Sequence, residues 1–373
     1  MMLTLDLLVT FFNRDKAATA EPGEESQTFS ARCHCGNVQY SVVLPASSLP
    51  LDAYICSCTL CRYSHGTFGS FHVSLTQGVA PEWTNGTINL SVYKSQNSGP
   101  GGHGQRWFCP TCGTHNGHYE PWAMQWIADI ALFDEPSFWE MKGFAFPKSP
   151  GDGGLMTWIS SPVSKGLRLL TADRDIAPDN KLEMGEDGEE RLRAECQCGG
   201  VSFTIGRPSD VVRNDKFMSR SIAPGDPQKW KAYLDFDKET RRLSSAYFMP
   251  WALVPRISLE PEVPPNLLIG TMKTYKASEK ITKGFCGRCG ATVFLQSKDR
   301  NPSEQSEVLG IAAGLLRAPE GAKATNWVKW RAVPEREIEK MTEFDAEFMN
   351  AIVEGQRAWA VEKYGEAQEF EVI

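Results

Sequence analysis

One stretch decides the fold: CHCGNVQYSV at residues 33–42. Two cysteines separated by one residue precede a glycine, and apolar residues then alternate with polar ones, as in a half-buried β-strand. The same pattern returns as CQCGGVSFTI at residues 196–205. We infer an internal repeat, with one domain in each half of the chain.

Each of these CxCG turns is followed much later by a CxxCG knuckle, WFCPTCG at residues 107–113 and GFCGRCG at residues 284–290. A CxC turn and a CxxC knuckle can share one tetrahedral zinc ion, and the glycines relieve the backbone where amides crowd toward sulfur. We predict two structural four-cysteine zinc sites. The first comprises Cys33, Cys35, Cys109 and Cys112, and the second comprises Cys196, Cys198, Cys286 and Cys289.

The three remaining cysteines lie together in CSCTLCR at residues 56–62. Thiols in a CxCxxC spacing can converge on one metal ion, and three of them leave a coordination position open for water or a substrate thiol. A coordinated thiol loses its proton, which makes it a nucleophile. We therefore predict an open zinc site at Cys56, Cys58 and Cys61; the alternative is a third structural zinc, closed by another side chain.

Composition limits the setting and the partners. All eleven cysteines belong to short clusters, and an odd number cannot all pair within the chain. Metal-bound thiolates in a reducing intracellular compartment, cytoplasmic or nuclear, fit better than disulfides. The net charge of −7 argues against nucleic acid as a partner. The apolar residues 1–12 are too short to span a bilayer, so no membrane partner is expected.

Short alternating apolar runs separated by turn residues predict a mainly β protein. The expected first domain covers residues 27–170, and an acidic linker covers residues 171–190. A repeat of the same domain follows at residues 191–334. Apolar residues at helical spacing then predict an amphipathic C-terminal helix over residues 335–365, packed on the second domain or available to a partner.

Polar residues close to the triplet are candidates for the chemistry. His65 and His72 can serve as a proton carrier or as a fourth ligand, although either can also be a satisfied core residue. Arg62 can hold a carboxylate such as that of glutathione, or it can brace backbone carbonyls. We place Cys56, Cys58, Cys61, Arg62 and His65 in the predicted catalytic site.

The second half lacks the triplet. At an ungapped offset of 180, the three thiols fall on Phe236, Lys238 and Arg241, which cannot hold zinc together. We expect the second domain to keep only its structural zinc. The cations can mark an anion pocket or simply form a solvated turn.

The order CxCG, CxCxxCR, CxxCG resembles the glutathione-dependent formaldehyde-activating enzyme family, which includes centromere protein V-like proteins. The matching residues are Cys33, Cys35, Gly36, Cys56, Cys58, Cys61, Arg62, Gly66, Cys109, Cys112 and Gly113. The second half is similar in its outer parts and is degenerate at the triplet. The resemblance implies two tandem β-tent domains and the condensation of glutathione with formaldehyde to S-hydroxymethylglutathione, a carbon–sulfur lyase activity.

The expected function is therefore a zinc-dependent carbon–sulfur lyase whose partners are a small thiol such as glutathione and a small aldehyde. The alternative is a non-catalytic zinc scaffold or protein-interaction module, as the centromere protein V-like members suggest. The second domain would then serve a partner that the sequence does not identify.

Overall fold

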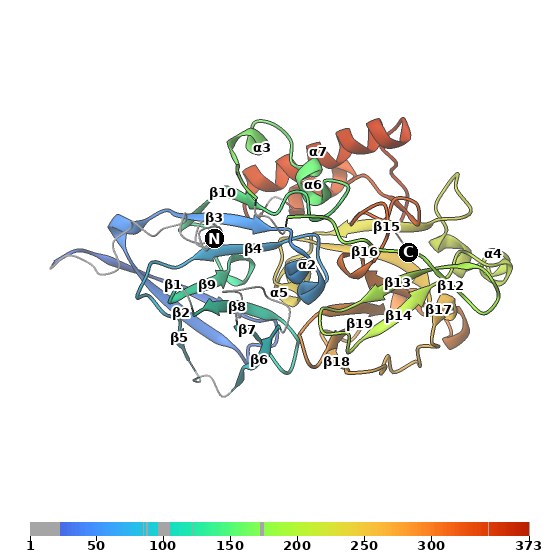
Figure 1. Ribbon diagram of the computed structural model, residues 1–373, viewed down its shortest axis with the longest axis horizontal. Helices are drawn as coiled ribbons and strands as arrows, with labels where there is room; N and C mark the ends of the chain where they lie inside the picture. Colours follow the sequence, from blue (N-terminus) through green and yellow to red (C-terminus); the bar gives the residue numbers. More distant parts are fainter. Residues whose placement is uncertain are drawn as a thin grey trace.

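The computed structural model describes residues 23–84, 86, 89–95, 105–121, 123–171, 175–341 and 343–372. The apolar residues 1–12 lie outside the described residues. The fold is mainly β, as predicted, and the sheets of the two halves lie side by side (Figure 1). Within the described part of the chain, no helix is long and apolar enough to cross a membrane.

The first half contains a small and a large sheet. The small sheet has the order β1 (Ser26–Arg32), β2 (Gln39–Pro45), β5 (Glu82–Trp83). The large sheet has the order β11 (Arg168–Leu170), β10 (Trp139–Ala145), β3 (Leu51–Cys56), β4 (Ser70–Ser74), β9 (Gln125–Asp129), β8 (His115–Glu120), β7 (Gln105–Phe108), β6 (Ser91–Lys94).

The second half is built in the same way. Its small sheet has the order β12 (Glu183–Met184), β13 (Glu190–Glu195), β14 (Ser202–Ile205), β17 (Leu259–Glu260). Its large sheet has the order β18 (Met272–Lys276), β19 (Ile281–Cys286), β20 (Thr292–Ser297), β21 (Val308–Ala312), β16 (Met249–Pro255), β15 (Trp230–Asp235), β22 (Val328–Trp330). Strand β12 lies inside the segment predicted as a linker.

Helices are short before the C-terminal region. The α-helices are α2 (Thr59–His65), α3 (Val163–Gly166), α4 (Asp210–Asn214), α5 (Lys238–Ser244), α6 (Glu335–Met341) and α7 (Ala346–Tyr364). The 3-10 helices are η1 (Ala46–Ser48), η3 (Ile130–Leu132), η4 (Gly154–Trp158), η5 (Met218–Ser221), η6 (Arg256–Ser258), η7 (Lys298–Arg300), η8 (Glu304–Ser306) and η9 (Ala313–Leu315).

The two halves repeat the same strand order, apart from the edge strands β11 and β12, which have no counterpart. Helix α2 follows β3 and precedes β4, and α5 follows β15 and precedes β16. The caps match as well: Cys58 and Asp237 are the N-caps, and Gly66 and Ser245 are left-handed C-caps. This register differs by one residue from the ungapped offset of 180. The residues in place of Cys56, Cys58 and Cys61 are therefore Asp235, Asp237 and Thr240, and the assignment of Phe236, Lys238 and Arg241 was wrong.

The halves contact each other through their knuckles and the ends of α2 and α5. Helix α2 contacts η9 of the second half, and α5 contacts η3 of the first. A Cβ on Gly113 would lie 2.4 Å from the Phe285 ring, and one on Gly290 would lie 2.8 Å from the Phe108 ring. Each knuckle thus packs against an aromatic residue of the other half. Glycine is required at both turns, because both also have a positive φ.

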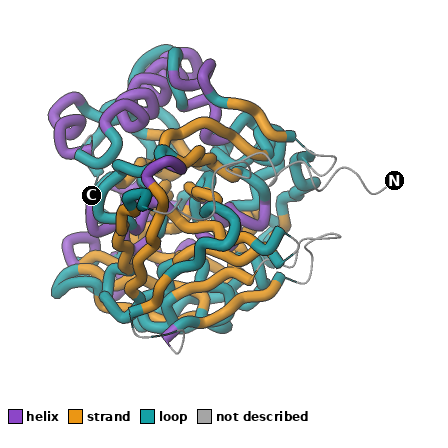
Figure 2. Tube along the Cα trace, turned by 90° about the vertical axis from the view of Figure 1, so that its left-hand side faces the viewer, coloured by secondary structure: helices purple, strands orange, loops and turns teal. Residues whose placement is uncertain are grey.

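The predicted C-terminal helix is confirmed over α7, but residues 335–341 form the separate helix α6. Helix α7 packs on both halves and not on the second alone. Helices α3, α6 and α7 lie together over one side of the sheets (Figures 1 and 2). Ser160 N–H donates to Ala351 O at 2.9 Å, and Gln356 Nε2 donates to Arg331 O at 2.9 Å. Between them, Gly355 passes the Trp158 backbone so closely that a Cβ would lie 2.3 Å from its oxygen.

Candidate metal centres and active site

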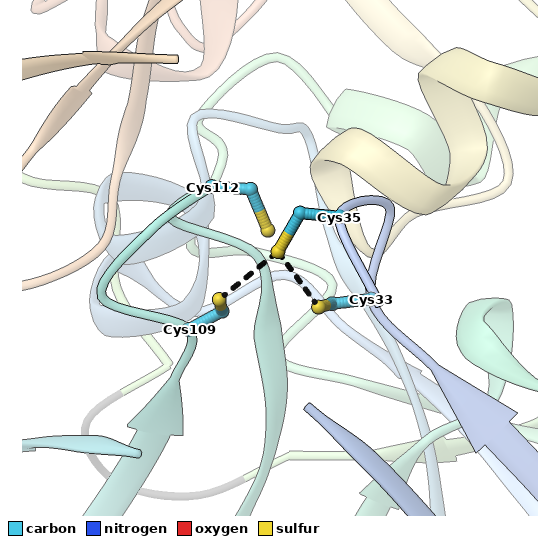
Figure 3. A group of neighbouring side chains, drawn as sticks. All are labelled: Cys33, Cys35, Cys109 and Cys112. Atoms are coloured by element: carbon cyan, nitrogen blue, oxygen red, sulfur yellow. Dashed lines mark hydrogen bonds between the residues drawn. The ribbon is translucent and has the colours of Figure 1, made fainter. Parts of the chain in front are cut away.

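The first four-cysteine cluster joins strands that are far apart in sequence (Figure 3). The sulfurs of Cys33, Cys35, Cys109 and Cys112 all lie within 4.8 Å of one another. Cys35 Sγ is 3.5 Å from both Cys33 Sγ and Cys109 Sγ. The Val38 N–H donates to Cys33 Sγ at 3.4 Å, which stabilises a thiolate there. This cluster can hold a metal ion.

The second cluster has the same construction. Cys196, Cys198, Cys286 and Cys289 also converge within 4.8 Å. The Gly200 N–H donates to Cys198 Sγ at 3.4 Å, and the Cys289 N–H donates to Cys286 Sγ at 3.4 Å. Amide donors aimed at sulfur favour the charged form of each thiol. Both clusters predicted from the CxC and CxxC spacings therefore form.

The third cluster contains Cys56, Cys58 and Cys61, which meet where β3 ends and α2 begins. Cys56 Sγ is 3.5 Å from Cys58 Sγ, and the Cys61 N–H donates to Cys58 Sγ at 3.4 Å. Cys56 and Cys61 are buried, whereas Cys58 is partly exposed. Cys58 is therefore the least buried residue of the three.

The three clusters fit zinc by their donor chemistry. All eleven thiols are free, so none is used in a disulfide. Tetrahedral zinc with bonds of about 2.3 Å spaces its sulfurs by roughly 3.7 Å, close to the 3.5 and 3.6 Å separations that bonded sulfur pairs show here. Two clusters supply four thiols, and one supplies three.

A buried cation and an imidazole lie beside the triplet. Arg106 Nη2 is 3.5 Å from Cys61 Sγ, and His72 Nε2 is 3.9 Å from the same sulfur. Burial alone would lower the pKa of Arg106, but the nearby thiolates of Cys61, Cys58 and Cys56 raise it overall. Arg106 therefore remains charged and offsets part of the negative charge of three thiolates.

A carboxylate beneath the triplet organises two histidines. Asp129 Oδ1 is 2.8 Å from His72 Nδ1, and Asp129 Oδ2 is 3.5 Å from His65 Nε2. Burial alone would raise the pKa of Asp129, but His65 and His72 hold it well below its usual range. Burial would lower the pKa of His72, yet Asp129 raises it to about 9. The Asp129–His72 pair thus carries both charges at neutral pH.

Two further histidines complete this buried cluster. His115 stacks on His65 with ring centroids 4.1 Å apart, and the His118 and His72 centroids are 5.1 Å apart. Burial lowers the pKa of His115 well below its usual value, and burial also lowers the pKa of His118. Both are therefore neutral near pH 7.

The structure places the predicted site residues at different distances from the thiols. Arg62 is buried, and its guanidinium donates to Ser57 O at 3.1 Å and to Ser149 O at 3.2 Å, so it braces the loop that carries the thiols. His65 Nδ1 is 3.0 Å from Cys61 O and faces Asp129 with its other nitrogen. His72 contacts the triplet directly, with its Nε2 3.9 Å from Cys61 Sγ.

Sequence reasoning missed Arg106 and Asp129. Arg106 precedes the knuckle on β7, and Asp129 ends the strand β9. Both approach the triplet only through sheet pairing, where His72 faces Asp129 between β4 and β9. The sequence did contain one indication of both residues, because each is an isolated charged residue in an otherwise uncharged strand segment.

The corresponding place in the second half holds oxygen atoms and no sulfur. Asp235 Oδ2 accepts from Thr240 Oγ1 at 3.0 Å, and Asp237 caps α5. Arg241 Nη1 donates to Ala131 O and to Phe133 O, at 3.2 Å for the latter. The Arg241 cation is therefore used in the contact between the halves. Arg241 and Lys238 also line a small cavity, which the carboxylates of Asp134 and Glu343 share.

Comparisons with known proteins agree with the cysteine pattern of the first half. A protein of Halomonas elongata named "Putative glutathione-dependent formaldehyde-activating enzyme" is 29% identical over 89 residues, which cover 24% of this chain and 54% of that protein. The chain thus spans about half the length of this curated relative. Residues 28–145 match the family described as glutathione-dependent formaldehyde-activating enzyme, so this part of the chain is similar to the proteins of that family.

Proposed function

We propose that the first half is a zinc-dependent enzyme of the carbon–sulfur lyase type, which handles the adduct of glutathione, or another small thiol, with formaldehyde or another small aldehyde. The observation that carries the proposal is the triplet itself. Three convergent thiols, one of them partly exposed, lie beside a buried arginine and a histidine–carboxylate pair. The match of residues 28–145 to the glutathione-dependent formaldehyde-activating enzyme family supports the choice of thiol and aldehyde.

The proposed reaction balances without a further reagent. The sulfur of the thiol forms a bond to the aldehyde carbon, and the carbonyl π electrons move to oxygen. The proton lost from sulfur ends on that oxygen, which gives the hydroxymethyl thioether; the reverse reaction breaks the same carbon–sulfur bond. Zinc held by Cys56, Cys58 and Cys61 would favour the thiolate form of a bound thiol.

The residues around the triplet have separate roles in this proposal. His72 is held by Asp129 and can carry the transferred proton at Nε2, which is directed toward Cys61 and Ser70. Arg106 stabilises negative charge on sulfur or on the aldehyde oxygen. Arg62 and His65 keep the loop and the carboxylate in place through Ser57 O and Asp129 Oδ2.

We also propose that residues 27–170 and 191–334 are tandem domains of one family, joined by residues 171–190. The shared strand order and the second four-cysteine cluster support this. In this proposal both four-cysteine zinc sites are structural, and the second domain has lost the open site. Oxygen atoms of Asp235, Asp237 and Thr240 stand where the thiols would be.

The test is the rate at which glutathione and formaldehyde exchange with S-hydroxymethylglutathione, measured by NMR on the zinc-loaded protein. The wild-type protein should accelerate exchange over the uncatalysed rate, and Cys58→Ser, which should lose the zinc ion of the triplet, should return exchange to the uncatalysed rate. The matched control is Thr59→Ala, which changes the adjacent side chain and should keep the wild-type rate. Exchange no faster than the uncatalysed rate would favour the scaffold alternative.

A further inference from the structure

A hydroxyl of the second half reaches the buried carboxylate of the first. Ser245 Oγ donates a hydrogen bond to Asp129 Oδ2 at 3.2 Å. Ser245 is 0% exposed and Asp129 is 1% exposed, so water does not compete for this contact. Ser245 immediately follows α5, and Asp129 is the last residue of β9. The contact therefore connects the two halves directly beneath the triplet.

The backbone at Ser245 sets the direction of this hydroxyl. Ser245 is the C-cap of α5 and has φ 57° and ψ 36°. This left-handed backbone conformation is seldom adopted by residues other than glycine, asparagine and aspartate. The Ser245 N–H donates to Arg241 O at 3.0 Å, which ends the helix. A glycine would suit this backbone better, but it would supply no donor to Asp129.

At the equivalent junction, where the end of α2 meets the second half, the residues in the matching places are Gly66 and Ala312, which have no polar side chain. Gly66 is the left-handed C-cap of α2, and a Cβ there would lie 2.4 Å from the Thr292 carbonyl oxygen and 3.1 Å from the Ala312 methyl group. Ala312 ends β21, just as Asp129 ends β9. Of these two junctions, therefore, only the one next to the thiols joins the halves by a hydrogen bond between two side chains, which packing alone does not require.

We propose that Ser245 is a positioning residue through which the second half fixes the Asp129–His72 pair of the first. Asp129 Oδ2 accepts the hydrogen bond from Ser245 Oγ. This contact fixes the carboxylate so that Oδ1 stays 2.8 Å from His72 Nδ1. His72 Nε2 is then kept toward Cys61. The catalytic consequence rests on the proposed function, whereas the positioning itself does not.

The test uses two full-length, zinc-loaded variants. Ser245→Gly removes the hydroxyl and suits the left-handed backbone. Ser244→Ala is the matched control, because Ser244 is the adjacent buried serine and its Oγ donates to Thr240 O within α5 at 2.8 Å. The readouts are zinc content, the ring-nitrogen signals of His65 and His72 in ¹⁵N-histidine-labelled protein, and kcat and KM for the glutathione adduct.

We expect both variants to keep the wild-type zinc content. Ser245→Gly should shift the ring-nitrogen signals of His72 and His65 and lower kcat by about tenfold at unchanged KM; Ser244→Ala should do neither. Superimposable histidine signals in Ser245→Gly and wild type would overturn the positioning role. If the wild type shows no turnover, the proposed function has failed, and the histidine signals still decide the role of Ser245.

Discussion

At the scale of single residues, the site is organised by one buried carboxylate. Asp129 contacts His72 and His65 of its own half and Ser245 of the other. A buried charge that loses its partners is costly, so each of these contacts constrains the others. Because His72 also approaches Cys61, the protonation and orientation of the imidazole follow from Asp129.

Asp129→Asn should lower the free energy of unfolding at pH 7 by about 3 kcal/mol, because it leaves a buried imidazolium without its carboxylate. The folded-state pKa of Asp129 lies below the unfolded value of about 3.9. Its stabilisation is therefore fully present above that value and is lost as pH falls toward the folded pKa. Urea unfolding between about pH 7 and 3 measures both effects.

The control for this prediction is Asp179→Asn. The Asp179 side chain is 88% exposed and pairs with Lys181 at 3.4 Å on the surface. The substitution should therefore change the free energy of unfolding by no more than about 0.5 kcal/mol at every pH. The difference in the free energy of unfolding between wild type and Asp129→Asn should become smaller below about pH 4. A difference that stays constant down to pH 3 would contradict the ion pair.

The site residues that lie in short sequence motifs could be predicted from the sequence. The site residues that are brought together only by sheet pairing could not. The cysteines of each CxC and CxxC motif are neighbours in sequence, and all three predicted clusters form. Arg106 and Asp129 join the triplet from strands far along the chain. The interactions that bring them there are backbone pairings, which no local pattern specifies.

At the scale of elements, α7 joins the two halves. Its C-terminal position and amphipathic spacing were predictable, but its contacts were not, because they depend on how the halves lie together. The aromatic rings of Phe68, Trp158, Trp330 and Trp359 meet beneath it at centroid distances of 5.2–5.5 Å. These rings come from the first half, the second half and the helix itself.

Gly355→Ala should destabilise the protein by about 2 kcal/mol, because the added methyl group would lie 2.3 Å from Trp158 O and forces α7 away. Gly166→Ala is the control. It is also a helical glycine, no atom lies within 4 Å of its added Cβ, and the change should be neutral or slightly stabilising. Thermal melts of both variants provide the measurement; equal melting temperatures would refute the close packing.

The predicted alignment of the second half on the first was wrong by one residue, and the reason lies in the helices. An ungapped offset assumes equal loop lengths, whereas the caps of α2 and α5 define the true register. Replacement of Cys58 by Asp237 preserves an N-cap, since aspartate also accepts a backbone hydrogen bond. The helix therefore survives in a half that has lost the thiols.

At the scale of the whole molecule, the two halves share one continuous hydrophobic core. Each knuckle packs on an aromatic ring of the opposite half, Phe285 or Phe108. Lys283 of the second half is buried, and its Nζ donates to Leu243 O. Burial lowers the pKa of Lys283 to about 8, although the thiolates of the first cluster, Cys112 foremost, favour its charge.

Cys198→Ser should therefore destabilise both halves together. It would remove a ligand of the second proposed structural zinc site, and structural zinc is worth about 10 kcal/mol in small zinc domains. Differential scanning calorimetry should show one transition that moves to lower temperature as a whole. Two separate transitions, one of them at the wild-type temperature, would show that the halves unfold independently.

The most direct test of the central claim is the zinc content of wild type and Cys58→Ser, counted by native mass spectrometry. The three cysteine clusters predict three zinc ions per wild-type chain. Cys58→Ser should hold two and should keep the wild-type far-ultraviolet circular dichroism, because the second half maintains the same strand order without these thiols. Two zinc ions in both proteins would contradict the account.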